Sequence, residues 1–383
     1  MDYVNALSGL ISIDTSAPPG DNYGETMECL APLFRHAGFQ TETVVIPPEH
    51  AEGQTGRVNL VCHRRSQGKP RLIFYGHVDV VPAAGWDAFS PRFADGKIYG
   101  RGAADMKGGI VALLGGLDTV RGASLRYDVS VVVTTDEEVS QASQLHYLAH
   151  FLAPVNGANV FSLDNSFGYV SIAGLGALHM VIKVKGKSVH SALSHLGENA
   201  IEKAVPLLQA LLDLKSRVVK RESRVGAHPD TGLSRMQARL NINVINGGLK
   251  VNIVPDQCLI SIDRRLIPEE DIAGAEREIL DCLSSVPGVD WGVESSFKIP
   301  TVPPCEDAIV DELSAVIQKV TGTTGKFGEM GSGDLSHIVT SEWKGKEFGL
   351  GVIRPECNIH GNTEFVYLRD IEALAEIIAE FLV

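Results

Sequence analysis

His77 and Asp79 lie two residues apart at the end of an apolar run, residues 71–76, which has the composition of a buried strand. Because residues i and i+2 of a strand point to the same face, the two side chains can approach one another. A carboxylate that holds one ring nitrogen of a histidine presents the other nitrogen to a metal ion. The alternative is a strand-end histidine that only hydrogen-bonds its neighbour. Acidic clusters elsewhere in the chain favour the metal.

Asp105 belongs to a glycine-rich segment, residues 100–109, that leads into the apolar segment 110–114. An aspartate in this position commonly caps the N-terminus of a helix, and a cap is the simpler interpretation. A cap, however, does not require so many glycines. Glycines permit tight turns and close backbone approach, as is expected where a loop brings a carboxylate to a crowded centre. We therefore place Asp105 at the predicted site.

Acids also follow two further apolar segments. The β-branched run 129–135 predicts a buried strand and leads into three acids that include Glu137 and Glu138, whereas the shorter run 159–163 leads into Asp164. Consecutive carboxylates there repel one another unless a cation or a proton separates them. Because adjacent side chains diverge, one carboxylate can bind metal while the other takes a proton. The C-terminal ends of strands are where open α/β sheets build their sites, although surface strands also end in solvated acids.

The order of predicted elements indicates two architectures in one chain. Strand and helix patterns alternate up to about residue 175, beginning with helices near residues 2–12 and 25–37, which favours an α/β domain with a mostly parallel sheet and helices on both faces. From residue 177 the pattern is that of a small α+β unit with an antiparallel sheet. Its predicted strands are 178–184, 238–244 and 257–266, and its predicted helices are 199–212 and 273–283. The polar stretch 215–234 is expected to be a mobile loop.

Length and composition limit the number of domains, the partners and the compartment of the protein. A chain of 383 residues is long enough for about two domains. The net charge of -13 argues against nucleic acid or an anionic membrane as a partner. There is no long apolar run and no charged-then-apolar leader, so we expect a soluble, unexported protein. The six cysteines lack a Cys-x-x-Cys spacing and are expected to be thiols in a reducing cytoplasm.

Taken together, these motifs resemble the M20 metallopeptidase and amidohydrolase family, which includes acetylornithine deacetylase, succinyl-diaminopimelate desuccinylase, aminoacylases and carboxypeptidases of the G2 type. The matching segments follow the family's order and cover nearly the whole chain. They are residues 76–82, 100–108, 135–138, 186–192, 251–255 and 263–265, and His360 with Glu364. No single segment is as specific as their combination.

The resemblance implies two zinc ions, for which Co²⁺ or Mn²⁺ would be substitutes. His77 and Asp164 would bind one ion, Glu138 and His360 the other, and Asp105 would bridge them. Histidine and carboxylate ligands suit Zn²⁺, and two neighbouring ions need an anionic bridge to offset their repulsion. In the deacetylase and desuccinylase branches the position of Asp164 is often glutamate followed by Pro-Thr, whereas several dipeptidase branches have aspartate. This departure keeps the metal role and leaves the substrate branch open.

The same resemblance implies the domain organisation. Because His360 must return to the metals of His77, the first domain has to resume after the α+β unit. Residues 1–177 and 293–383 would form the catalytic domain, and residues 178–292 an inserted lid and dimerisation domain of a homodimer. In the family, the histidine that matches His190 reaches the partner subunit's site, and it is our candidate oxyanion donor; a structural histidine is the alternative.

Three candidates concern the substrate. Arg265 matches a family position that offers a bidentate donor to a substrate carboxylate, and its alternative is an ion pair with Asp263 or Glu269. Asn252 orients the substrate or only satisfies the turn that follows it. The third is a loop that resembles the family's substrate-binding loop of backbone amides, and a tight turn is compatible with that role. Its candidate residues are Gly331 and Ser332.

We therefore expect a zinc-dependent amidohydrolase that removes an N-acyl group from an amino acid or a related amine. Glu137 would take a proton from the metal-activated water and pass it to the departing amine. A dipeptidase or carboxypeptidase of the same family is the alternative that Asp164 supports. A metal-stabilised binding protein without turnover is the alternative outside enzymes, and the free base Glu137 counts against it.

Overall fold

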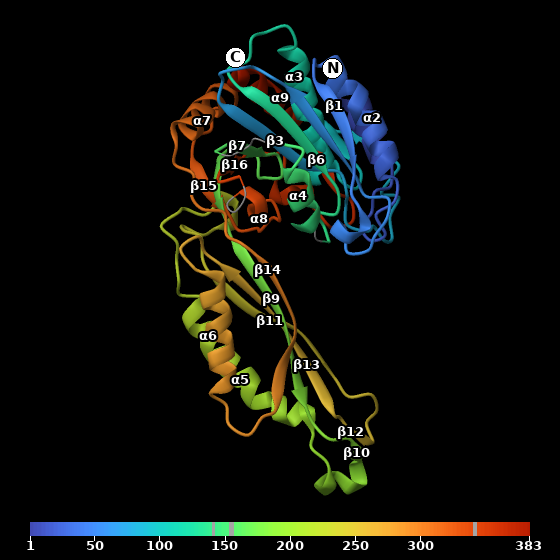
Figure 1. Cartoon of the computed structure of the whole chain (residues 1–383), viewed down its shortest axis with the longest axis vertical. Helices are drawn as coiled ribbons and strands as arrows, with labels where there is room; N and C mark the ends of the chain where they lie inside the picture. Colours follow the sequence, from blue (N-terminus) through green and yellow to red (C-terminus); the bar gives the residue numbers. More distant parts are fainter. Residues whose placement is uncertain (140–141, 153–156, 340–342) are drawn as a thin grey trace. The chain divides into compact units, whose positions relative to one another are not determined.

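The computed structural model divides by its contacts into two units (Figure 1). The residues that it describes are 1–139, 142–152, 157–339 and 343–383. Unit 1 comprises residues 1–173, 305–329 and 334–383, and unit 2 comprises residues 174–304 and 330–333. The return to unit 1 therefore follows residue 304, not residue 292 as predicted. The reason is that β14 (Trp291–Ile299) pairs with β9 (Gly176–Lys185) and so belongs to the sheet of unit 2.

Unit 1 is built on an eight-stranded sheet with a parallel centre, in agreement with the predicted fold class. The parallel strands are β6 (Asp128–Thr134), β3 (Arg71–His77), β7 (Asn159–Ser162) and β16 (Lys346–Gly349). The remaining strands lie at the two edges. They are β1 (Gln40–Val45) and β2 (Val58–Arg64), which are antiparallel, and β8 (Val170–Gly174) and β15 (Lys326–Glu329) on the other side. The C-terminal ends of the parallel strands consequently meet at one edge of the sheet, as a site of this type requires.

Helices cover both faces of this sheet because its central strands are apolar on both sides. On one face Phe161 lies 6.1 Å, ring to ring, from Phe381 of α9 (Leu368–Leu382), which packs on α3 (Gly108–Thr119). On the other face Val160 belongs to a buried cluster with side chains of α4 (Ala142–Ala149) and α8 (Ser336–Val339). The further helices of this unit are α1 (Tyr3–Ile11), α2 (Tyr23–His36) and α7 (Ala308–Thr321). No helix among the described residues is long and apolar enough to cross a membrane.

Unit 2 is the expected α+β unit, with a four-stranded antiparallel sheet in the order β11, β13, β9, β14. The elements not yet defined are α5 (Ala200–Val218), β11 (Arg239–Gly247), β13 (Gln257–Leu266) and α6 (Ile272–Ser284). A short pair, β10 (Val189–His190) and β12 (Ile253–Val254), lies beyond the sheet (Figure 1). The predicted loop 215–234 differs from the structure: α5 continues to Val218, and Val225 and His228 are buried because the segment packs onto the unit.

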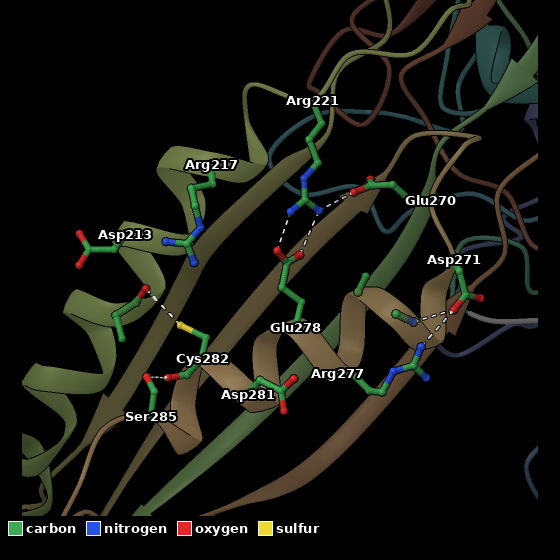
Figure 2. A pocket seen from close by; sticks show the side chains of 13 residues that line it. Asp213, Arg217, Arg221, Glu270, Asp271, Arg277, Glu278, Asp281, Cys282 and Ser285 are labelled. Carbon is green, nitrogen blue, oxygen red and sulfur yellow. Dashed lines mark hydrogen bonds and ion pairs between the residues drawn. The ribbon is translucent and has the colours of Figure 1, made fainter.

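A buried arginine ties the helices of unit 2 to its sheet. Arg264 of β13 has no exposed side-chain surface, and its guanidinium pairs with Glu270 directly before α6. Glu270 also accepts a hydrogen bond from Arg221, which follows α5 and pairs with Glu278 of α6 (Figure 2). Arg221, Glu270 and Glu278 line a groove of about 850 Å³ between the two helices. Glu270 therefore offsets the charge of Arg264, which would otherwise be buried without a partner.

We expect Glu270→Ala to lower the free energy of unfolding of unit 2 by about 3 to 5 kcal/mol, the usual effect of leaving one partner of a buried pair unpaired. Amide hydrogen exchange of β13 measures this quantity for the unit alone. Glu276→Ala, on α6 itself, is the control, because Glu276 pairs with the partly exposed Lys298 and its loss should change the free energy by less than about 1 kcal/mol. Equal effects of both variants would contradict the assignment.

Candidate metal centre

His77 is the last residue of β3, and both its backbone and its ring have partners in unit 1. Its backbone N–H lies 3.3 Å from the sulfur of Met106, for which Gly76 leaves room, since a Cβ there would lie 2.7 Å from the Met106 methyl carbon. Nδ1 of His77 lies 3.1 Å from the backbone carbonyl of Asp79 and 3.4 Å from its carboxylate. The carbonyl is the nearer partner, whereas the sequence predicted the carboxylate. In either case Nδ1 is engaged and Nε2 faces the centre.

The carboxylate of Asp79 has a second partner that the sequence did not indicate. Its Oδ2 accepts a hydrogen bond of 2.9 Å from the backbone N–H of Glu138. Asp79 has no exposed surface, so this bond is shielded from water. The loop after β3 and the loop after β6 are thereby fixed to each other.

The loop that carries Asp105 is wrapped around a buried carboxylate, Glu364. Glu364 accepts the backbone N–H groups of Gly102, Ala104 and Asp105 at 3.1, 3.0 and 3.2 Å, and the guanidinium of Arg101 at 2.7 Å. No role for Glu364 or Arg101 was predicted from the sequence. The available signal was a glycine-rich loop whose backbone donors need an acceptor, together with the position of Glu364 four residues after His360.

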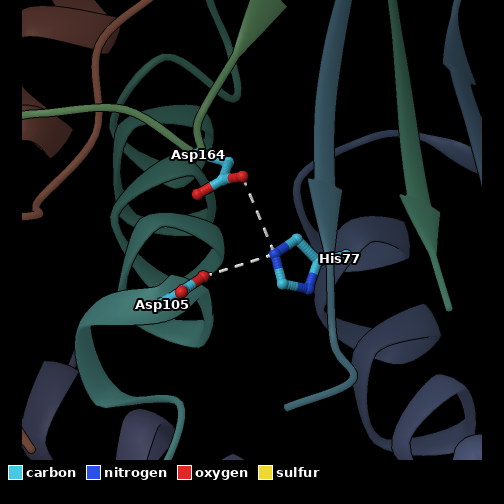
Figure 3. Close-up of side chains that lie close together, drawn as sticks. All are labelled: His77, Asp105 and Asp164. Carbon is cyan, nitrogen blue, oxygen red and sulfur yellow. Dashed lines mark ion pairs between the residues drawn. The ribbon is translucent and has the colours of Figure 1, made fainter. Parts of the chain in front are cut away.

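Asp164 follows β7 on a loop that is held by Glu329 of β15. The backbone N–H and the hydroxyl of Ser166 donate to the Glu329 carboxylate at 3.2 and 3.1 Å. The neighbouring backbone approaches closely at Gly351, where a Cβ would collide with the carbonyl oxygen of Asn165. These contacts leave the Asp164 side chain directed toward His77 (Figure 3).

The predicted ligands form two groups that share Asp105. In the first, Nε2 of His77 lies 3.4 Å from Asp105 Oδ1 and 3.9 Å from Asp164 Oδ2 (Figure 3). In the second, Nε2 of His360 lies 3.0 Å from Asp105 Oδ2 and 3.3 Å from Glu138 Oε1. Within each group the donor atoms all lie within 4.8 Å of one another. The two oxygens of Asp105 thus point to different groups, which is the arrangement that a bridging carboxylate needs.

The pKa values reflect a strongly negative centre. The neighbouring carboxylates of Asp105 and Glu138 raise the pKa of His360 to about 10. Burial disfavours charge on His77, yet the carboxylates of Asp105 and Asp79 outweigh it and raise its pKa. Burial and the charge of Asp105 raise the pKa of Asp164 to about 7. The centre therefore attracts positive charge, and in this chain it takes protons where it holds no cation.

The donors fit a metal. Nε2 of His77 and Oε1 of Glu138 are buried and form no hydrogen bond with any described residue. Buried polar atoms of this kind call for a partner, and imidazole nitrogen with carboxylate oxygen is a donor set that suits Zn²⁺. Glu137 lies beside this set, and burial together with Asp164, Glu138 and Asp79 raises its pKa, although the charge of His77 opposes the rise.

The remaining predicted site residues lie in unit 2, at two separate places. One place holds Arg265 and Ser332, and the other holds His190 and Asn252. Arg265 donates to the hydroxyl of Ser332 at 3.2 Å and pairs with Asp263 at 2.9 Å, so one of its predicted alternatives is present. Next to Ser332, the carbonyl of Gly331 accepts a hydrogen bond of 2.9 Å from the N–H of Leu175. The second pair is formed by two residues of the short β10–β12 region. His190 is exposed, and the residue after it donates its N–H to the carbonyl of Asn252 at 3.0 Å.

The two pairs lie at opposite ends of the same sheet. Arg265 is opposite Ala177 near the start of β9, whereas the β10–β12 pair follows the end of β9 at Lys185 (Figure 1). At about 3.3 Å per strand residue, this part of β9 alone spans about 26 Å. Arg265 and His190 of one chain are therefore too far apart to contact one small substrate.

The parallel sheet, the inserted unit and the shared-carboxylate cluster are features of a two-domain α/β hydrolase with a metal centre. A profile of peptidase family M20/M25/M40 matches residues 73–383, and the chain belongs to this family. It is accordingly a hydrolase of amide bonds, as the motifs predicted.

Individual relatives support the same placement. The chain is 28% identical to the succinyl-diaminopimelate desuccinylase of Gluconacetobacter diazotrophicus, over 96% of this chain and 93% of that protein. It is 29% identical to the acetylornithine deacetylase of Vibrio parahaemolyticus, over 74% and 73% of the two chains. The M20 family metallo-carboxypeptidase Sso-CP2 from Sulfolobus solfataricus has the same fold, with a TM-score of 0.83, 16% identity, and coverage of 100% of this chain and 98% of that one.

Metal binding should displace a proton from His360. With a pKa of about 10 the imidazole is charged near neutral pH, and a metal ion binds only its neutral form. We expect Zn²⁺ titration near neutral pH to release about one proton fewer from His360→Ala than from the unsubstituted protein. Calorimetry in buffers of different ionisation enthalpy measures the release, and His36→Ala, at an exposed position on α2, is the control.

The raised pKa of His360 also makes the stability of the metal-free protein depend on pH. A folded-state pKa above the ordinary value contributes stability that is complete below about pH 6.5 and is lost as the pH rises toward about 10. Bound metal should remove this pH dependence.

If Zn²⁺ titration releases as many protons from His360→Ala as from the unsubstituted protein, His360 is not a ligand.

Proposed function

We propose that this protein is a zinc-dependent amidohydrolase that cleaves the amide bond of an N-acyl amino acid. The observation that supports it most directly is the pair of ligand groups that share Asp105, with Glu137 close enough to interact electrostatically with His77, Asp164 and Glu138. In the proposal, His77 and Asp164 would hold one ion, Glu138 and His360 would hold the other, and Asp105, which belongs to both ligand groups, would serve both. Co²⁺ or Mn²⁺ are the expected substitutes for Zn²⁺.

When bound, the two ions supply Lewis-acid activation of a water molecule and of the scissile carbonyl. Glu137 accepts a proton from the attacking water and then donates it to the departing amine. Its raised pKa, caused by burial and by the neighbouring acids, suits a group that both takes and gives a proton. Asp79 keeps His77 and Glu138 in place through the contacts described above.

Substrate recognition is assigned to unit 2. Asp263 and Ser332 hold the guanidinium of Arg265, which keeps N–H donors for the carboxylate of an amino acid. The backbone at Gly331 and the side chain of Asn252 complete the proposed contacts. A deacylase is favoured by the full-length similarity to a desuccinylase and by the similarity to a deacetylase. A dipeptidase or carboxypeptidase remains the second candidate, because Asp164 occupies a position that is aspartate in several dipeptidase branches.

Parallel assays with N-acetyl amino acids, N-succinyl amino acids and unblocked dipeptides, each with Zn²⁺, Co²⁺ and Mn²⁺, test the proposal.

Two variants test which of the adjacent glutamates is the general base and which is a metal ligand. Glu137→Gln should keep its metal and lose about 10²- to 10⁴-fold in kcat, the contribution of a positioned acid–base group. Glu138→Gln should lose metal affinity instead. Near-normal turnover in Glu137→Gln would overturn the assignment of the base, and a chain that binds metal but hydrolyses none of these amides would be the non-enzyme alternative.

A homodimer is part of the proposal, with His190 of one subunit serving the site of the other. The separation of His190 from Arg265 within unit 2 supports it, because both residues serve one substrate only if they come from different chains. Unit 2 also exposes apolar side chains next to Asn252: Leu249 and Val251 are 97% and 98% exposed. Exposed apolar surface of this kind favours a protein partner, and a second copy of unit 2 is the proposed one.

The proposed dimer surface includes one face of α5 and the edge strand β11. Its exposed apolar side chains are Ile201, Val205 and Leu212 on α5, and Val244 and Ile245 on β11. The three α5 residues recur at helical spacing, and β11 lies at the edge of the sheet, next to β13. An edge strand with apolar side chains pairs readily with another chain.

All six cysteines are free, which supports the reducing cytoplasm as the proposed compartment.

Complementation tests His190. Removing one oxyanion donor typically lowers kcat about 10²- to 10³-fold, so we expect His190→Ala to be severely impaired yet folded and metal-loaded. In a mixed dimer with Glu137→Gln, the His190→Ala chain keeps its own base and receives an intact His190 from its partner. One of the two sites is then complete, and activity should recover toward about half of the unsubstituted value. If verified subunit exchange restores nothing, His190 does not act in the partner's site.

A further inference from the structure

Asp136 is a buried acid that precedes Glu137 and takes no part in the ligand groups. It is 3% exposed and has a positive φ of 64°. Residues other than glycine rarely adopt such a φ, and they keep it only where the surroundings enforce it. The side chain of Asp136 shows how the surroundings do so.

Three donors from separate parts of unit 1 converge on the Asp136 carboxylate. The hydroxyl of Tyr23 donates to Oδ1 at 2.7 Å, and Nε of Arg57 and Nε2 of Gln144 donate to Oδ2 at 2.7 and 2.8 Å. These residues belong to the start of α2, to the segment before β2 and to α4. Burial and the charges of Asp79 and Asp136 raise the pKa of Tyr23, so its hydroxyl stays a donor.

Arg57 is itself fixed, so the carboxylate is anchored to a rigid group. Its guanidinium donates to the carbonyls of Pro19 and Thr55 at 2.9 and 3.1 Å, and its side chain is 7% exposed. A Cβ at Gly20 would collide with the same guanidinium, so this glycine is needed for the approach. Tyr23, Arg57 and these backbone groups all precede residue 73, where the match to the family profile begins.

The segment 137–138 is consequently held at both ends. On one side the Asp136 carboxylate accepts its three donors, and on the other the N–H of Glu138 donates to Asp79. Two adjacent carboxylates that must point in different directions need a backbone with fixed dihedral angles. Such a backbone is what the two attachments provide, since each buried charged hydrogen bond resists rotation of the chain around Glu137.

We propose that Asp136, with Tyr23, Arg57 and Gln144, is a positioning group for the general base Glu137. This inference rests on the proposed function, because it assumes that Glu137 moves the proton. The four residues belong to neither ligand group, and the proposal places none of them against the substrate. Their effect is to keep the Glu137 carboxylate where the attacking water is, and small misplacements of a catalytic group lower rates steeply.

Tyr23→Phe is the sharpest test, because it removes one donor and keeps the ring. We expect kcat to fall about 10- to 100-fold, with KM and metal content unchanged. Gln144→Met should act in the same direction through a different donor. The matched control is Tyr127→Phe, at the opposite end of β6, where the ring stacks on Phe381; its kcat should not change.

A double-mutant cycle separates positioning from general stability. In the Glu137→Gln background there is no base to position, so adding Tyr23→Phe should leave the residual turnover within about two-fold. If Tyr23→Phe lowers the turnover of Glu137→Gln as strongly as that of the unsubstituted enzyme, the residues stabilise the fold and do not position the base. Unchanged kcat in both Tyr23→Phe and Gln144→Met would also overturn the proposal.

Amide hydrogen exchange gives a result that does not depend on turnover. The N–H groups of residues 136–139 should exchange faster in Tyr23→Phe than in the unsubstituted protein, and not in Tyr127→Phe. A chain that hydrolyses no amide would contradict the proposed function, and the exchange rates would still decide whether these residues hold the segment. Equal exchange in all three proteins would overturn the positioning role.

Discussion

The structure of unit 1 depends on holding several carboxylates within a few ångströms of one another in a buried place. Asp105, Glu138 and Asp164 approach the same two imidazoles, and Glu137 lies beside them. Each of these acids repels the others, and the repulsion grows as water is excluded. The raised pKa values of His77 and His360 are the direct consequence of this charge. A centre of this kind is unfavourable without cations, so the fold has to supply the free energy that keeps it assembled.

That free energy comes partly from a second set of acids, whose function differs from that of the ligands. Glu364, Glu329, Asp79 and Asp136 each accept hydrogen bonds from N–H or O–H donors of other segments. Their charges are satisfied by protein donors, and each joins two stretches that are distant in sequence. Glu138, by contrast, keeps a buried oxygen without a hydrogen bond. Hydrogen-bond partners thus distinguish the acids that hold loops from the acids that can hold metal, although the residue types are the same.

This distinction also explains which parts could be predicted from the sequence. Local patterns were sufficient for the strand 257–266, which β13 matches, and for placing His77, Glu138 and Asp164 after apolar strands. The roles of Arg101 and Glu364 were missed because the two lie 263 residues apart, and no local period relates them. The prediction of a mobile loop at residues 215–234 was wrong, because a polar composition does not reveal that Val225 and His228 are buried. The junction after residue 292 was misplaced because the pairing of β14 with β9 is equally non-local.

The division of residues between the units has a consequence for specificity. Every candidate metal ligand belongs to unit 1, whereas Arg265, Asn252 and His190 belong to unit 2. Arg265 projects from the partly exposed face of β13, while Arg264 on the opposite face supports the helices. Because side chains alternate along a strand, Arg265 and its neighbours can change without disturbing the buried network beneath them. If Arg265 binds the substrate as proposed, substitutions on this face would alter which substrate is bound, while the carboxylate cluster, held by separate contacts in unit 1, would keep its arrangement.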